Sequence, residues 1–283
     1  MLIVRTYSAL QKAMAMQQPY HVQTAFVPTM GALHDGHLQL VHAARQQAQL
    51  VVVSIFVNPT QFNDAADFVQ YPVSIEQDIQ LLEAVGTDIV YLPSVAEMYP
   101  LGTANLEHYP LGQLENVLEG KFRPGHFQGV CQVVSRLLQQ VQPGLLVMGQ
   151  KDYQQCMVVQ AMIDYLQLPV HMLRVPTKRE PDGLAMSSRN RRLSPAERVA
   201  AVAMYLALLQ MATNARHLPI AELEAKAASQ LLAAGFHKLD YISLVHADTL
   251  LPVSQPATEP MLAIAAAFLG AVRLIDNLPV AQP

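Results

Sequence analysis

The chain has 283 residues, of which 52% are hydrophobic and 14% charged, and its formal net charge is −4. This length allows one large core or two domains, and the small negative charge disfavours broad attraction to nucleic acid or to an anionic membrane. We therefore expect small-molecule partners, with no nucleic acid and no membrane among them.

The targeting features and the cysteines are those expected of a cytoplasmic protein. Residues 1–5 lack the basic region, long apolar stretch and cleavage site of a secretory signal. The apolar run at residues 261–269 is too short to span a bilayer. Cys131 and Cys156 lie in apolar, helix-like segments, which favours buried free thiols over a disulfide framework.

Apolar, β-branched runs alternate with helix-like stretches over residues 1–175. This alternation predicts a Rossmann-like α/β fold, in which helices cover both faces of a parallel sheet. The expected strands are residues 25–27, 50–57, 88–92, 145–148 and 170–175.

Polar and glycine-bearing turns follow four of these strands. Because ligands bind at the carboxyl ends of parallel strands, these turns should meet at one edge of the sheet and form a site there. The turns are residues 28–37, 58–62, 149–152 and the segment from 176 onward.

After residue 192 the pattern becomes that of a smaller α+β unit. Residues 194–197, Ser-Pro-Ala-Glu, have the form of a capping box with proline at the first helical position. We predict a Rossmann-like domain over residues 1–175 and an α+β domain over residues 176–283. Within the second domain, helices are expected at 199–211 and 220–234, strands at 241–245, 261–268 and 272–275, and an exposed loop at 252–260.

His34 and His37 lie across a glycine turn where the first of these strands leads into a helix-like run. Asp35 and Gly36 are the expected turn or capping residues, and N–H groups at a helix start attract anions. Imidazoles beside such a site can donate hydrogen bonds to phosphoryl oxygens, and a protonated His37 can stabilise charge on a departing pyrophosphate. The segment therefore indicates a nucleotide phosphate site.

Three other sites fit this turn less well. Gly31 and Gly36 have P-loop spacing, but His37-Leu38 stands where Lys-Ser/Thr is required. The G-x-G-x-x-G fingerprint of dinucleotide binding is absent. No nearby Cys or His cluster completes a zinc set around the two histidines. Two surface histidines in a loop remain the plainer alternative for the isolated pair.

Five segments in chain order together resemble one family. They are residues 28–37, 54–62 (SIFVNPTQF), 119–130 (EGKFRPGHFQGV), 149–155 (GQKDYQQ) and 182–190 (DGLAMSSRN). On these segments the chain resembles the pantothenate synthetase (pantoate–β-alanine ligase) family, of the HxGH nucleotidyltransferase superfamily. Residues 274–277 (LIDN) also resemble it.

The resemblance implies an ATP-dependent, AMP-forming carbon–nitrogen ligase of pantothenate and coenzyme A biosynthesis. The carboxylate of pantoate attacks the α-phosphorus of ATP, pyrophosphate leaves, and β-alanine then attacks the pantoyl adenylate to give pantothenate and AMP. Mg²⁺ is expected with ATP, and no residue is assigned to bind it. The family further implies a homodimer and a C-terminal domain that acts as a lid.

The resemblance also implies the roles of the site residues. His34 would contact the phosphates, His37 would donate a proton, and Lys151 would place a charge on the triphosphate, while Arg189 would help to close over it. These four are the expected catalytic residues. The expected ATP-binding residues are Met30, Gly31, Ala32, Leu33, His34, Asp35, Gly36, His37, Gly149, Gln150, Lys151, Asp152, Lys178, Met186, Ser187, Ser188 and Arg189.

Two glutamines are the expected substrate ligands, again by resemblance. Gln61 would bind pantoate and later β-alanine, and Gln155 would bind pantoate, because a carboxamide offers a donor and an acceptor on one short arm. Arg123 and His126, in a Pro-Gly turn, either border the pantoate pocket or are structural.

Three positions depart from the family pattern, and each change removes a charge: Val73, Gln150 and Gln160. These losses motivate one alternative, a non-catalytic nucleotide-binding protein, which the retained histidines, Lys151 and the 187–189 segment argue against. A second alternative is another HxGH nucleotidyltransferase acting on a phosphorylated acceptor. Such an enzyme should have an acceptor pocket rich in Lys or Arg, whereas Gln61 and Gln155 suit a small carboxylate with hydroxyls.

Overall fold

The computed structural model describes residues 1–17, 23–63 and 65–281, which form two compact units. The first unit comprises Met1–Gly112, Arg123–Gln150 and Gln155–Pro176. The second comprises Gln113–Phe122, Lys151–Gln154 and Thr177–Pro283. The chain therefore passes into the second unit twice, briefly, before its long C-terminal segment.

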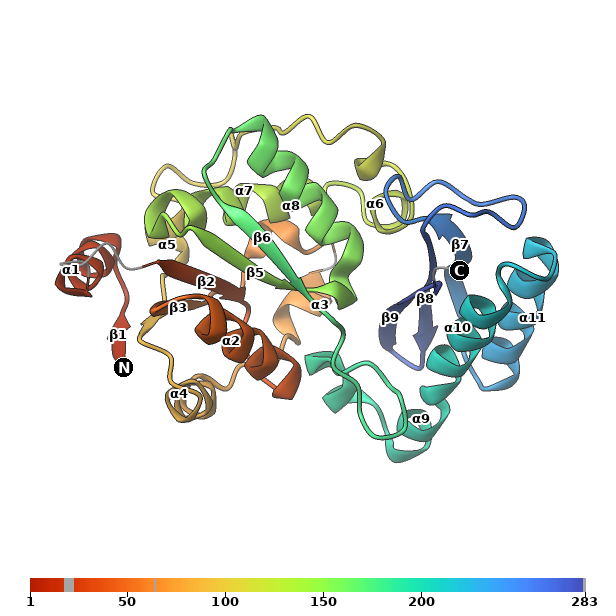
Figure 1. Cartoon of the computed structure of the whole chain (residues 1–283). Helices are drawn as coiled ribbons and strands as arrows, with labels where there is room; N and C mark the ends of the chain where they lie inside the picture. The colour runs from red at the N-terminus through yellow and green to blue at the C-terminus, as the bar shows by residue number, and fades with distance from the viewer. Residues whose placement is uncertain (18–22, 64, 282–283) are drawn as a thin grey trace. The chain divides into compact units, whose positions relative to one another are not determined.

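The first unit contains a six-stranded parallel sheet in the order β1-β4-β3-β2-β5-β6 (Figure 1). From β2 the chain adds β3 and β4 on one side and then returns to add β5 and β6 on the other, and such a reversal marks the ligand-binding edge in doubly wound sheets. The Rossmann-like α/β prediction is thus confirmed. The strands are β1 (Leu2–Val4), β2 (Thr24–Thr29), β3 (Leu50–Ile55), β4 (Ile89–Tyr91), β5 (Leu145–Gly149) and β6 (His171–Val175).

Strand β1 was not expected from the sequence. It pairs in parallel with β4 at the edge of the sheet. It has three residues, and Leu2 and Ile3 are 39% and 45% exposed. A strand this short and this exposed shows no hydrophobic periodicity, which explains why it gave no signal.

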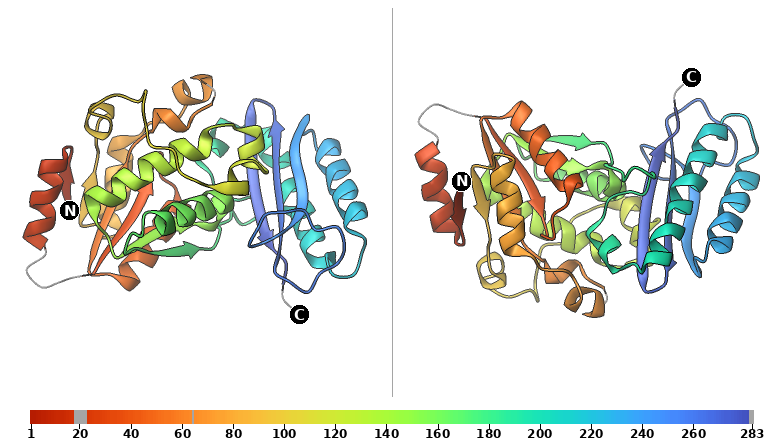
Figure 2. Two further views of the ribbon diagram at one scale, coloured as in Figure 1. Left: turned by 90° about the horizontal axis from the view of Figure 1, so that it is seen from above. Right: turned by 90° about the horizontal axis from the view of Figure 1, so that it is seen from below.

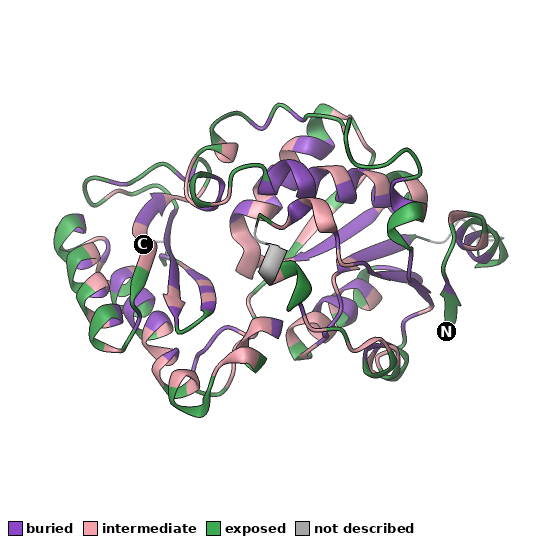
Figure 3. Ribbon diagram, turned by 180° about the vertical axis from the view of Figure 1, so that it is seen from behind, coloured by how far each residue is buried: buried purple, intermediate pink, exposed green. Residues whose placement is uncertain are grey.

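Helices cover both faces of the sheet, as expected. Figure 2 shows α2 (Asp35–Gln47) and α4 (Ile75–Ala84) on one face, and α7 (His126–Val141) and α8 (Tyr153–Tyr165) on the other. Because both faces are covered, the four inner strands β2, β3, β4 and β5 are buried along almost their whole length, whereas the edge strands β1 and β6 are partly exposed (Figure 3). The shorter helices and turns of this part of the chain are α1 (Tyr7–Gln17), η1 (Pro59–Gln61), α3 (Ala65–Val69), α5 (Val95–Met98), η2 (Gly112–Glu115) and η3 (Gln150–Asp152).

Period-two alternation divides the strand side chains between the two faces. Ala25 and Val27 of β2 pack in the cluster that includes Leu40 and Val41 of α2, so Phe26 between them faces the opposite side. On that side Cys131 of α7 and Cys156 of α8 are free and buried, which confirms the expectation for both thiols. No helix in the described part of the chain is long and apolar enough to cross a membrane.

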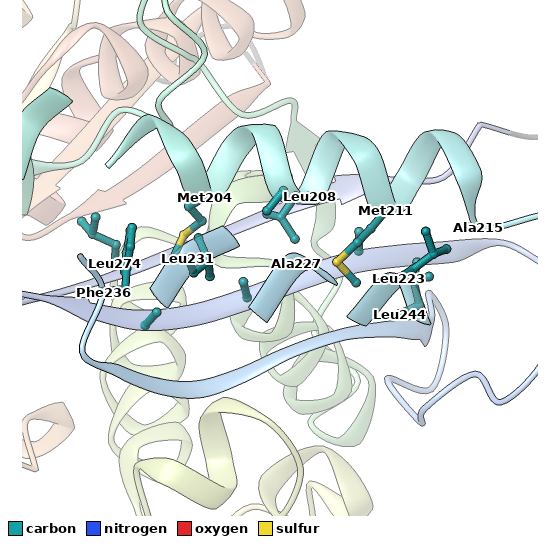
Figure 4. Close-up of a cluster of buried hydrophobic side chains, with 14 of the residues drawn as sticks. Met204, Leu208, Met211, Ala215, Leu223, Ala227, Leu231, Phe236, Leu244 and Leu274 are labelled. Atoms are coloured by element: carbon teal, nitrogen blue, oxygen red, sulfur yellow. The ribbon is translucent and has the colours of Figure 1, made fainter. Parts of the chain in front are cut away.

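The second unit has a three-stranded antiparallel sheet, β7-β8-β9, covered by two helices. Alanines on the buried face of β8 occupy little space, so the helix side chains pack closely on the sheet. Figure 4 shows Met204, Leu208 and Met211 above Leu223, Ala227 and Leu231, with Leu244 and Leu274 from the sheet. The elements are α6 (Glu119–Phe122), η4 (Ser188–Arg192), α9 (Pro195–Ala200), α10 (Val202–Asn214), α11 (Ile220–Ala233), β7 (Lys238–His246), β8 (Met261–Leu269) and β9 (Val272–Pro279).

The capping box at the start of α9 forms as predicted, because the Ser194 side chain accepts from the Glu197 N–H and Glu197 accepts from the Ser194 N–H. The helix expected over residues 199–211 is instead divided between α9 and α10. Ala201 lies between them and keeps a right-handed backbone, with φ −58° and ψ −26°, so the two helices follow one another almost directly.

Candidate active site

His34 and His37 cap the start of helix α2, at the carboxyl end of the central strand β2. The Nδ1 atom of His34 accepts from the Gly36 N–H at 3.1 Å, and Nδ1 of His37 accepts from the His34 N–H at 3.4 Å. This is a capping box built from two imidazoles, whose ring centroids lie 4.1 Å apart. The N-cap is therefore His34, and the expectation that Asp35 or Gly36 caps the helix was wrong. Asp35 is instead the first helical residue.

The turn before His34 is held from α4 by one carboxylate. Oδ2 of Asp78 accepts from the Ala32 N–H and Oδ1 accepts from the Leu33 N–H, both at 2.8 Å. Asp78 is 1% exposed, and the side chains of Ala32 and Leu33 are also buried. Of the residues expected to bind ATP, these two therefore offer the nucleotide no side chain, and their N–H groups are bonded to Asp78.

Gln61 lies in a buried polar cluster at the end of β3. Its Oε1 accepts from Asn58 Nδ2 at 3.2 Å, and its Nε2 donates to the sulfur of Met30 at 3.0 Å. Oδ1 of Asn58 in turn accepts from the Tyr99 hydroxyl at 2.8 Å. The structure thus brings Gln61 to Met30, two residues that were expected to bind pantoate and ATP respectively.

Arg123 and His126 contact the main chain of the Gln61 turn. Nδ1 of His126 lies 2.8 Å from the Gln61 carbonyl oxygen, and Arg123 donates to the same oxygen at 3.4 Å. Behind them, a Cβ on Gly129 would lie 2.4 Å from the Thr60 carbonyl oxygen. The glycine therefore allows α7 to approach η1, and the Arg-Pro-Gly-His-Phe-Gln-Gly segment supports the Gln61 turn.

Three other predicted residues of the first unit lie around the turn from β5 to α8. Gly149 ends β5, Gln150 follows it, and Gln155 is partly buried near the start of α8. A cavity of about 250 Å³ is lined by Met30, Gly31 and Asp78, among others, but its lining does not include Gln61 or Gln155. Its volume is below the range that is usual for nucleotide-sized ligands.

In the second unit, Lys151 is anchored to the end of β9. The side chain of Asn277 donates from Nδ2 to the Lys151 carbonyl oxygen at 2.8 Å, and Nζ of Lys151 lies 4.0 Å from Asp152 Oδ1. Burial raises the pKa of the Asp276 carboxyl, while Arg179, and to a lesser degree Lys151, lower it. Lys151, in a turn that was expected to bind ATP, is therefore held by strand β9.

The same strand holds the segment that leads to residues 186–189. Nη1 and Nη2 of Arg179 donate to the Asp276 carboxylate, at 2.6 and 2.9 Å, and Arg179 also lies over the ring of Tyr205. The Met186 N–H donates to the Lys178 carbonyl oxygen at 3.0 Å. Lys178 itself is exposed.

Residues 187–189 form the start of the short helix η4. The Ser187 side chain accepts from the Arg189 N–H at 3.3 Å and caps this turn. Ser188 is buried, while Arg189 is partly buried. The second unit thus brings Lys178 and the 186–189 segment together with Lys151 through their shared anchorage on β9.

A buried ionic cluster joins α6 to the sheet of the second unit. Arg273 donates to both oxygens of Glu119, at 2.9 and 2.7 Å, and to Asp240 at 2.7 Å. Burial, and then the negative charge of Glu119, raise the pKa of Tyr241 well above its usual value. The phenol therefore keeps its hydrogen and donates to Glu119 at 2.8 Å.

The site has no dedicated metal cage among the residues that the structure describes. Among residues 1–17, 23–63 and 65–281, no three His, Cys, Asp or Glu side chains gather in a metal-binding arrangement. Hard cations such as Mg²⁺ need several oxygen ligands, which substrate phosphates and water often supply.

Sequence reasoning missed the supports of the site. No role was assigned to Asp78, nor to the Asp276-Asn277 pair, although residues 274–277 resembled the family. Asn58 had a detectable signal, since an Asn just before Pro59 suits an N-cap. Tyr99 had none, because its partner Asn58 is 41 residues away.

Known proteins of one family match this chain over almost its whole length. The family model described as Pantoate-beta-alanine ligase matches residues 2–279. A pantothenate synthetase of Pseudomonas entomophila is 46% identical over 277 residues, which are 97% of this chain and 96% of that protein. One of Xylella fastidiosa is 45% identical and covers 97% and 98% of the two chains.

Solved structures agree in fold over the whole chain. A pantothenate synthetase of Thermus thermophilus superposes with a TM-score of 0.92 at 44% identity and covers 100% of both chains. The pantoate-beta-alanine ligase of Francisella tularensis, described in complex with beta-gamma ATP and beta-alanine, has a TM-score of 0.84 at 35% identity and covers 100% and 99%. The chain therefore belongs to the pantoate–beta-alanine ligase family.

Proposed function

We propose that this chain condenses pantoate with β-alanine at the expense of ATP, through a pantoyl adenylate, and releases AMP and pyrophosphate. The observation that carries the proposal is the pair of capping histidines at the carboxyl end of β2, within a family match over residues 2–279. The ATP and β-alanine named for the Francisella tularensis protein support the choice of substrates.

In the first step a carboxylate oxygen of pantoate attacks the α-phosphorus of ATP, and the bond to pyrophosphate breaks. In the second, the amine of β-alanine attacks the acyl carbon, the bond to AMP breaks, and the amine loses a proton. The protein's task is to hold the reacting groups in line and to stabilise charge on the leaving pyrophosphate.

The capping geometry defines what the two histidines offer to phosphate. Because both Nδ1 atoms accept backbone hydrogen bonds, each neutral ring carries its hydrogen on Nε2. We assign Nε2–H of His34 to the phosphates of bound ATP, and Nε2–H of His37 to an oxygen of the departing pyrophosphate. A hydrogen bond from a fixed donor stabilises this charge more as it develops, which is how such groups lower a barrier.

Gln61 is assigned to pantoate and then to β-alanine. Its Oε1 accepts from Asn58, so its NH₂ group is the one that points away from this bond. That NH₂ group donates to the thioether sulfur of Met30, which is a weak acceptor. A pantoate hydroxyl or carboxylate oxygen would be a better partner for that donor. Gln155 is assigned to pantoate as a second carboxamide.

The remaining ATP-binding residues are each assigned a contact. Gly149 and Gln150 approach the nucleotide through the main chain, Lys151 places its charge on the triphosphate, and Asp152 contacts the ribose. Lys178 offers main-chain groups to adenine, and Met186, Ser187, Ser188 and Arg189 contact the phosphates. Mg²⁺ would enter with ATP, whose phosphate oxygens together with water could supply its ligands, and no residue of the chain is assigned to it.

Three further properties belong to the same proposal. Residues 176–283 act as a lid that keeps water from the acyl adenylate, a reactive mixed anhydride. The enzyme is a homodimer, and it works in the cytoplasm. Support for the lid comes from Lys151 and the 186–189 segment, which share their anchorage on β9.

The test is to measure AMP and pyrophosphate after ATP is mixed with pantoate, with β-alanine, and with both. We expect pyrophosphate from pantoate alone in an amount close to that of active sites, and sustained AMP release only when β-alanine is added. Turnover that requires a phosphorylated acceptor in place of pantoate would instead establish the alternative HxGH nucleotidyltransferase. Formation of ADP would exclude adenylate transfer.

A further inference from the structure

The carboxylate of Asp78 occupies a place that a turn of this kind usually offers to a ligand. The N–H groups of Ala32 and Leu33 converge on its two oxygens at 2.8 Å, and Ser74 Oγ donates to Oδ1 at 3.1 Å. Successive N–H groups that point into one concavity form an anion-binding nest. Here the anion is a side chain of the protein, 1% exposed, delivered by helix α4.

The backbone of this turn is in a conformation that needs such support. Gly31 has φ +84° and Ala32 has φ +49°, so two successive residues lie in the left-handed region. For the alanine this conformation is unfavourable, because its Cβ comes too close to the carbonyl oxygen that follows. Gly31 is also confined, because a Cβ there would lie 3.0 Å from Asp78 Oδ2 and from Ile55 Cγ2.

The turn leads directly into the histidine caps. Leu33 is followed by His34, whose own N–H bonds to His37 and whose ring bonds to Gly36. A change in the direction of the chain at Ala32 and Leu33 would therefore rotate the His34 N–H away from the His37 ring. The geometry of both imidazoles depends on the turn that Asp78 holds.

We propose that Asp78 is a positioning residue for the reaction, which fixes residues 31–33 in the left-handed turn and thereby aims His34 and His37 at the phosphates. The proposal rests on the assignment of these histidines to the nucleotide. Asp78 also engages the N–H groups of Ala32 and Leu33, so that phosphate contacts the histidines and the helix start rather than this nest.

The variant Asp78→Asn tests the proposal with little change in shape. Its amide has one acceptor oxygen, so its NH₂ group must face one of the two backbone N–H groups. Hydrogen bonds to a charged partner contribute about 1.5–3 kcal/mol, so we expect pyrophosphate formation from ATP and pantoate in a single turnover to slow by about 10- to 100-fold. The matched control is Glu76→Gln, which removes a charge from an exposed position on the same helix and should keep the wild-type rate.

A spectroscopic readout separates positioning from simple loss of stability. In ¹⁵N-histidine NMR spectra of the wild type, the rings of His34 and His37 should show the Nε2–H tautomer, with Nδ1 as acceptor. Asp78→Asn should change these two signals in spectra recorded at a temperature at which the variant is still folded. Because this readout requires no turnover, it also distinguishes failure of the positioning role from failure of the proposed reaction.

A folded Asp78→Asn protein with wild-type rate and unchanged histidine signals would overturn the proposal. If Asp78→Asn does not fold, Ser74→Ala decides, because it removes only the third hydrogen bond to the carboxylate. We expect that variant to slow the same step by about two- to tenfold, as loss of one hydrogen bond implies. A wild-type rate in Ser74→Ala would then overturn the proposal.

Discussion

Asn277 donates a hydrogen bond from Nδ2 to the main-chain oxygen of Lys151 at 2.8 Å, across 126 positions of sequence. Asn277 is 1% exposed, so its hydrogen bond is shielded from water. Breaking this bond would leave a polar group unpaired, which costs free energy of folding. The position of the Lys151 turn is therefore set by the last strand of the chain.

Replacing Asn277 with Ala should weaken ATP binding more than it slows the chemistry. Loss of one buried hydrogen bond costs about 1–1.5 kcal/mol. If this loss weakens the binding of ATP, KM for ATP should rise about tenfold. Asn214→Ala is the control, because Asn214 makes a similar 2.8 Å bond to Gln210 at an exposed position of the same unit. Equal KM values for the two variants would show that Asn277 does not hold Lys151 for the nucleotide.

His37→Ala should slow adenylate formation by about 100-fold or more, as expected when a donor to a developing charge is removed. It should also lower stability by about 1 kcal/mol, since one arm of the capping box is lost. The measurement is a single-turnover assay of pyrophosphate release, with thermal unfolding as a check on folding. His42→Ala, at an exposed position of the same helix, should leave the rate unchanged, and an unchanged rate in His37→Ala would remove this histidine from the mechanism.

Gly129→Ala should displace the turn that carries Gln61. The new Cβ would lie 2.4 Å from the Thr60 carbonyl oxygen and 2.8 Å from the Cα of Gln61. Such overpacking costs about 1–3 kcal/mol of stability, and we expect KM for pantoate to rise as Gln61 moves. In the control Gly144→Ala, the nearest atom would be 3.9 Å away. A folded Gly129→Ala protein with normal KM for pantoate would contradict the assignment of Gln61.

Tyr109 should make the protein less stable at alkaline pH. Burial raises the pKa of its phenol to about 12, from the usual 10.0. Between pH 10 and 12 the unfolded chain therefore loses this proton while the folded chain keeps it, so the free energy of unfolding falls by about 1.4 kcal/mol per pH unit. Below pH 10 the group has no effect, because it is protonated in both states.

Urea unfolding at pH 8 and pH 11 measures this contribution. The loss of stability between the two pH values should be about 1.4 kcal/mol smaller in Tyr109→Phe than in the wild type. The comparison within each protein cancels the constant cost of the lost bonds to Glu107 and Ser135. Identical losses in the two proteins would rule out Tyr109 as the cause.

Sequence patterns predicted those parts of the structure that depend on interactions between residues a few positions apart. The strand-to-helix junction at residues 28–37 was visible as an apolar run, a glycine turn and a helical repeat, and the structure places His34 and His37 there. The capping box at Ser194 was visible for the same reason. Each signal lies within a few residues, where hydrogen-bonding rules apply directly.

Supports that join distant segments left no such pattern. Asp78 bonds to the chain 45 and 46 residues before it, and Glu119 pairs with Arg273 across 154 residues. An aspartate on an amphipathic helix is usually solvated, so only the folded structure shows that this one is buried. The capping box of His34 and His37 could not be predicted either, because histidine is not among the preferred N-cap residues.

The most direct measurement of the proposed reaction follows an oxygen atom. Pantoate labelled with ¹⁸O in its carboxylate is incubated with ATP and β-alanine, and the products are analysed by mass spectrometry. If pantoate attacks the α-phosphorus, the oxygen that bridges the adenylate leaves with AMP, so AMP should carry one ¹⁸O and pyrophosphate none. Unlabelled AMP, or label in pyrophosphate or inorganic phosphate, would contradict a pantoyl adenylate.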